Sequence, residues 1–69
     1  MLAYRINWKN SSLEERNDVD KQLHKLGALY DNKVHLDRVD FMDIFLEETE
    51  IKSLDILKLP PSCTISRIN

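Results

Sequence analysis

The chain has 69 residues, with 10 basic and 12 acidic side chains and a formal net charge of −2. Proteins that bind nucleic acid through its phosphates usually have a basic excess, so this charge does not favour nucleic acid as a partner. A single domain spanning residues 1–69 is predicted, and domains of this size often need a disulfide, a metal or a partner for stability. The one cysteine, Cys63, cannot form an internal disulfide, so association with a partner is the expected supplement.

The expected location is the cytoplasm. The first residues lack the long apolar run of a secretory signal, and no stretch approaches the roughly 18 apolar residues of a membrane-spanning helix. A single cysteine also fits a reducing compartment. We therefore expect a soluble protein without a membrane partner.

The N-terminal segment has the period-two pattern of a half-buried strand. Its larger apolar side chains are Leu2, Tyr4, Ile6 and Trp8, which alternate with Ala3, Arg5 and Asn7. A helix is predicted next, capped by Ser11 or Ser12, with Glu14 or Glu15 three residues later completing a capping box.

This helix is expected from Leu13 to about Leu26, because Val19, Leu23 and Leu26 recur at spacings of three and four. The stripe extends to Tyr30. Gly27 follows the last apolar position and is expected to end the helix in the left-handed conformation. The charged side chains between Glu14 and Lys25, Arg16 among them, are expected to form a solvated face.

Val34 and Leu36 are expected to begin a second strand, and residues 39–46 fit two structures. As a strand, this segment places Phe41 and Phe45 on one face and the other large apolar residues, Met42, Ile44 and Leu46, on the opposite face. As an amphipathic helix over 37–48, it gathers its acidic residues on one side. Its β-branched and aromatic content favours the strand.

A second helix of about ten residues is predicted from an N-cap at Thr49 to just before Pro60-Pro61, with a strand over 51–59 as the alternative. Thr64 to Ile68 forms a closing β-branched strand. The resulting order is βαββαβ, which predicts a small α+β sandwich of the ferredoxin-like type, with two helices on one face of an antiparallel sheet.

A family resemblance accompanies this order. With Leu26-Gly27-Ala28 closing one helix and Thr49-Glu50-Ile51 opening the next, the chain resembles the compact ferredoxin-like proteins of the CRISPR-associated small endoribonuclease family and the antitoxins that share their fold. The nuclease members imply an aspartate at the end of the first strand that holds a metal. The corresponding segment here, Ile6-Asn7-Trp8-Lys9, has no carboxylate, so a divalent-metal-dependent nuclease is only the alternative function.

The other polar residues do not predict a catalytic, metal or cofactor site. Asp37, Asp40 and Asp43 recur every three residues, but on a strand they project to different faces and are better explained as solubilising charges. His24 and His35 lack partners at metal-ligand spacing. Cys63 has no activating base nearby in sequence, so a buried or incidental cysteine is expected.

Tyr4 and Trp8 share one face of the first strand and form a candidate aromatic surface for nucleic-acid bases. Only Arg5 and Lys9 supply positive charge nearby. Packing in the core is therefore the favoured interpretation.

The strand over residues 39–46 carries the main functional prediction, because it is apolar on both faces and one small chain can cover only one face of its sheet. The predicted interface residues are Phe41, Met42, Ile44, Phe45 and Leu46, one set contacting the protein's own helices and the other a second chain. We expect a non-catalytic homodimer or a protein-docking module. The resemblance implies a regulatory role in a toxin–antitoxin or phage-defence system.

Overall fold

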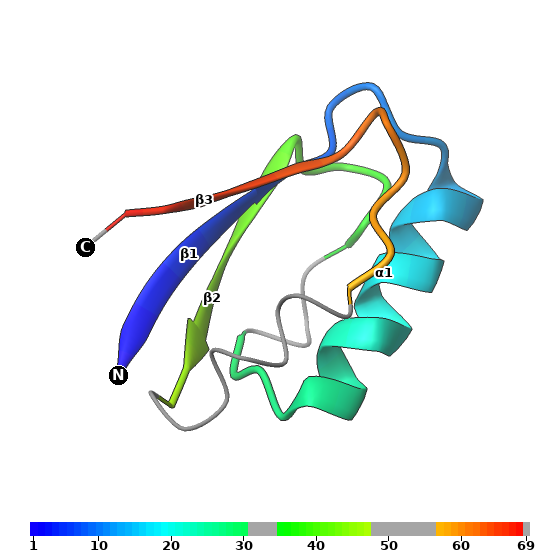
Figure 1. Ribbon diagram of the computed structural model, residues 1–69. Coiled ribbons are helices and arrows are strands. Elements are labelled where there is room, and N and C mark those ends of the chain that lie inside the picture. The colour runs from blue at the N-terminus through cyan, green and yellow to red at the C-terminus, as the bar shows by residue number, and fades with distance from the viewer. Residues whose placement is uncertain (31–34, 48–56, 69) are drawn as a thin grey trace.

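A three-stranded antiparallel sheet with one helix packed on one of its faces forms the described part of the molecule (Figure 1). The computed structural model describes residues 1–30, 35–47 and 57–68. Strand β1 (Leu2–Asn7) lies in the centre, between β2 (Phe41–Leu46) and β3 (Thr64–Arg67). The predicted α+β class is confirmed, and so are the first strand and the closing strand.

Both neighbours of β1 run antiparallel to it, and their register fixes which side chains lie side by side. Ala3 is opposite Phe45 and Arg5 is opposite Asp43 on β2, while Arg5 is also opposite Ser66 on β3. Leu29 extends the sheet beyond β2, because its backbone N–H donates to the Phe45 carbonyl and its carbonyl accepts the Phe45 N–H, both at 2.9 Å.

Helix α1 (Leu13–Leu26) begins and ends where the sequence predicts. Ser12 is the N-cap: its hydroxyl accepts the Glu15 N–H at 3.1 Å, and the Glu15 carboxylate accepts the Ser12 N–H at 2.9 Å, which completes a capping box. Gly27 ends the helix with φ of 81°. A residue without Cβ adopts this left-handed conformation at little steric cost.

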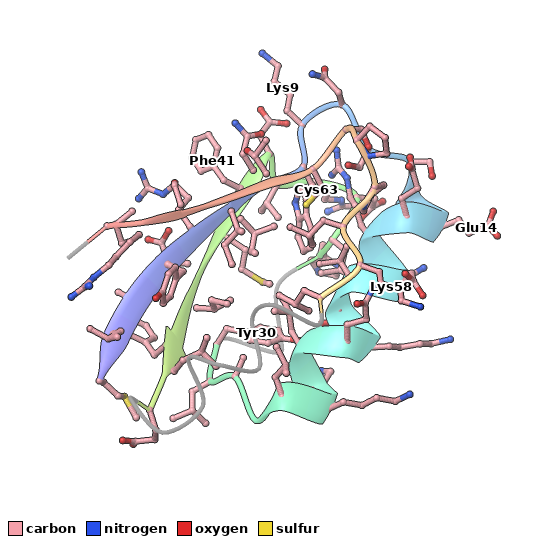
Figure 2. The ribbon with its side chains drawn as sticks, viewed as in Figure 1. Lys9, Glu14, Tyr30, Phe41, Lys58 and Cys63 are labelled. Atoms are coloured by element: carbon pink, nitrogen blue, oxygen red, sulfur yellow. The ribbon has the colours of Figure 1, made fainter. Side chains whose placement is uncertain are left out.

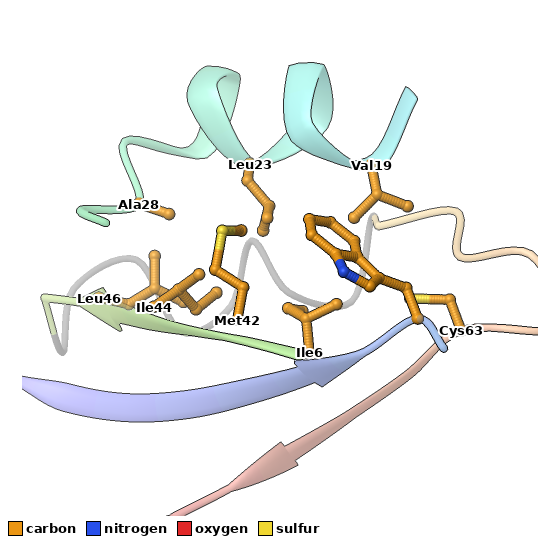
Figure 3. Packing of buried hydrophobic residues seen from close by; sticks show 9 residues of the cluster. Ile6, Val19, Leu23, Ala28, Met42, Ile44, Leu46 and Cys63 are labelled. Atoms are coloured by element: carbon orange, nitrogen blue, oxygen red, sulfur yellow. The ribbon is translucent and has the colours of Figure 1, made fainter. Parts of the chain in front are cut away.

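The core lies between α1 and the inner face of the sheet (Figure 3). Val19 and Leu23 project from α1 toward the strands, as their spacing predicts. From the strands come Ile6, Met42, Ile44 and Leu46, joined by Trp8, Ala28 and Cys63. Burial of these apolar side chains, at about 25 cal/mol per Å² removed from water, is the main term that stabilises the fold.

Arg16 does not lie on the solvated face of α1, contrary to the sequence prediction, but is buried at its N-terminal end. Its guanidinium donates to carbonyl oxygens of the two loops that flank β1 and β2. The acceptors are Lys9, Ser11, Leu36 and Val39, at 2.6 to 3.2 Å. The Cζ atom also lies 5.9 Å from the centre of the Trp8 ring. These contacts hold both loops against the helix.

The segment before β2 departs from the prediction. Leu36 lies in a turn, closed by a 3.0 Å hydrogen bond from the Arg38 N–H to the His35 carbonyl, rather than in a second strand. The ambiguity over residues 39–46 is resolved in favour of a strand, which begins at Phe41. Val39 is excluded because its carbonyl accepts bonds from the side chains of Trp8 and Arg16.

The described residues do not form the full βαββαβ arrangement. They contain one helix and a three-stranded antiparallel sheet, rather than two helices and four strands. Val34 and most of the predicted second helix, 49–56 with its Thr49 cap, lie outside the described residues. Residues 57–59, which the prediction included in that helix, are not helical. Within the described ranges, no helix has the length and apolar character needed to cross a membrane.

The outer face of the sheet as candidate functional site

The candidate site is the outer face of the sheet, meaning the side directed away from α1. The side chains of β2 alternate between this face and the inner one. Met42, Ile44 and Leu46 are buried against the helix layer and belong to the core, so they are the set that packs within the protein itself. Phe41 and Phe45 project outward and remain 54% and 43% exposed. Figure 2 shows the Phe41 ring on the side of the sheet away from α1.

Four apolar residues from four segments lie in line across the outer face. Residues directly opposite one another in antiparallel strands project to the same face. Leu29 pairs with Phe45, Phe45 lies opposite Ala3, and the Ile68 N–H donates to the Ala3 carbonyl at 3.0 Å, which places Ile68 opposite Ala3 on the other side. We call this line, Leu29–Phe45–Ala3–Ile68, the apolar row.

The apolar row is accessible at three of its four members. Leu29 is 54% exposed and Ile68 43% exposed, similar to Phe45, whereas Ala3 is only 5% exposed. Two backbone hydrogen bonds of Leu29 fix one end of the row to β2, and the bond from the Ile68 N–H to Ala3 fixes the other end to β1. Within the part of the chain that is described, the helix covers the opposite face and leaves this row uncovered (Figure 1).

The neighbouring position along the strands carries a compensated pair of charges. The Arg5 guanidinium donates to both carboxylate oxygens of Asp43, with Nε–Oδ1 at 2.8 Å and Nη2–Oδ2 at 3.2 Å. Its Cζ atom lies 5.3 Å from the centre of the Phe41 ring, which is within cation–π distance. Arg5 therefore links Asp43 and Phe41 into a fixed group beside the apolar row.

This pairing alters the acid–base behaviour of both partners. The hydrogen bond from Arg5, together with its charge, lowers the pKa of Asp43, and the reciprocal hydrogen bond raises the pKa of Arg5. Both groups are open to solvent, so the pair is worth little in stability, as is usual for surface ion pairs. Because the charges of Arg5 and Asp43 cancel, this part of the outer face carries no net charge near neutral pH.

The two aromatic residues proposed as a base-stacking surface lie on the inner side. Trp8 is fully buried and its Nε1–H donates to the Val39 carbonyl at 2.8 Å. Tyr4 is half-buried and packs against the core cluster. Trp8 therefore cannot present a ring to nucleic-acid bases, and packing in the core is its role.

The remaining candidate residues are not brought together. Asp43 is held by Arg5, while Asp37, Asp40, His24 and His35 are exposed. Among residues 1–30, 35–47 and 57–68, no three histidine, cysteine or acidic side chains are grouped as a metal site would require. Cys63 is buried, and burial together with the nearby Glu15 charge raises the pKa of its thiol, which is the opposite of what a nucleophilic cysteine needs.

A polar contact anchors the segment that carries Leu29. The Tyr30 hydroxyl donates to the Asp20 carboxylate of α1 at 2.5 Å, and His24 lies 3.5 Å from the same carboxylate oxygen. Partial burial of the phenol and the hydrogen bond to Asp20 raise the pKa of Tyr30. Tyr30 directly follows Leu29, so this hydrogen bond holds the Leu29 segment against the helix.

Three residues of the outer face were not predicted from the sequence: Leu29, Ala3 and Ile68. Each is placed on this face by the strand with which it pairs, and the sequence does not reveal that pairing. One local signal existed for Leu29. It is flanked by Ala28 and Tyr30, which are buried and half-buried, so the three residues alternate as an extended segment does.

Comparison of the chain with models of known protein families, with curated proteins and with solved structures finds no match.

Proposed function

We propose that this protein is a non-catalytic interaction module that binds a protein chain through the outer face of its sheet. The observation that carries the proposal is the apolar row, with large exposed side chains at three of its four positions. Contiguous exposed apolar surface with a polar margin is typical of protein-binding sites. Phe41 and Phe45 supply aromatic rings, which interfaces favour.

The charges of the outer face support protein over nucleic acid as the partner. Arg5 is paired with Asp43, so its charge is compensated before any phosphate approaches. The chain as a whole is acidic, with a net charge of −2. Affinity for nucleic acid depends largely on uncompensated Lys and Arg, and the outer face offers little of this.

The setting of this function is a further part of the proposal. The free thiol of Cys63 favours a reducing compartment such as the cytoplasm. A regulatory role in a toxin–antitoxin or phage-defence system rests on the family resemblance alone.

Site-specific photo-crosslinking in the source cells tests the proposed function. A photoreactive phenylalanine analogue is placed at Phe45 and, in a separate variant, at Leu13. Leu13 is the matched control because it is a large apolar residue, 50% exposed, that starts α1 on the other layer. We expect a protein adduct of defined mass from position 45 and none from position 13.

An Ile68→Asp substitution in the same experiment should reduce the yield from position 45 by at least about fivefold, because it places a charge at the far end of the apolar row. Absence of any protein adduct from position 45, whether with another copy of this chain or with a different protein, would refute the proposed function. So would equal yields from positions 45 and 13.

A further inference from the structure

We draw no further inference here: the strongest candidate, the apolar row of Leu29, Phe45, Ala3 and Ile68 on the outer face of the sheet, belongs to the site already described, and nothing in the described part of the structure shows what covers it.

Discussion

Arg16 has a buried guanidinium whose partners, within the described residues, are carbonyl oxygens rather than carboxylates. A buried charge destabilises a fold unless hydrogen bonds replace its hydration. Here the carbonyl dipoles of two loops do so, and Trp8 covers one side of the group. Arg16 thus connects the start of α1 to the loop after β1 and to the segment before β2.

We predict that Arg16→Met lowers the free energy of unfolding by about 2–4 kcal/mol, because several partly buried carbonyls lose their donor. Such a loss is most of the free energy of unfolding that a domain of this size commonly has. Urea unfolding followed by circular dichroism measures the effect. Lys21→Met, exposed on the same helix, is the control and should change stability by less than about 0.5 kcal/mol. Similar stability of the two variants would contradict the role assigned to Arg16.

Gly27 determines where the chain goes after α1. Its N–H donates to the His24 carbonyl and the Ala28 N–H donates to the Leu23 carbonyl, both at 3.1 Å, which satisfies two carbonyls that a helix end leaves unpaired. The left-handed turn then brings the next residues back along β2. Leu29 reaches its place beside Phe45 for this reason, so the helix cap helps to build the apolar row.

Gly27→Ala should destabilise the protein by about 1–2 kcal/mol, because Cβ crowds the following carbonyl in the left-handed conformation. Gly27→Asn is the informative comparison, since asparagine tolerates that conformation better, and it should cost less than alanine. Thermal and urea unfolding of the three proteins give the order of stability. If alanine proved as stable as glycine, the positive φ of 81° would not constrain this position.

Elements with local signals were predictable from the sequence. The caps and apolar stripe of α1, and the alternation within β1 and β2, depend on residues a few positions apart. Strand pairing was not predictable in the same way, because the pattern of β2 fixes its faces but not its neighbour. The second strand expected at Val34 and Leu36 is not formed by Leu36, which lies in a turn, and β2 pairs with β1.

The candidate site was likewise predictable only where its signal is local in the sequence. Phe41 and Phe45 were expected on one face, and the structure identifies theirs as the outer face. The burial of Arg16 was missed because its acceptors at Leu36 and Val39 lie 20 and 23 residues away. No periodicity within α1 could indicate them.

The whole molecule should lose stability in alkaline solution through Tyr30. The pKa of its phenol is raised in the folded protein by burial and by the hydrogen bond to Asp20. A raised folded-state pKa means that the stabilisation is fully present below the unfolded value, near 10, and is lost as pH rises from there toward the folded value. The unfolded chain releases the proton first, which favours unfolding.

We predict that above about pH 10 the free energy of unfolding falls more steeply with pH in the unmodified protein than in Tyr30→Phe. The variant should be less stable at pH 7 by about 1 kcal/mol, since it lacks the bond to Asp20. Urea unfolding at a series of pH values measures both effects. Parallel pH profiles for the two proteins would exclude Tyr30 as the source of the alkaline loss.

The two hydrogen bonds between Leu29 and Phe45 also determine which backbone groups at the edge of β2 are open to another molecule. Outward-directed backbone groups on the last strand of a sheet are where a foreign strand can add, and repeated addition leads to fibres. At Phe45 these groups are already bonded within the chain. An incoming strand would have to break both bonds, whereas the ring remains accessible. At Phe45 the edge of the sheet is therefore closed to strand addition, and contact with another molecule there is left to the side chain.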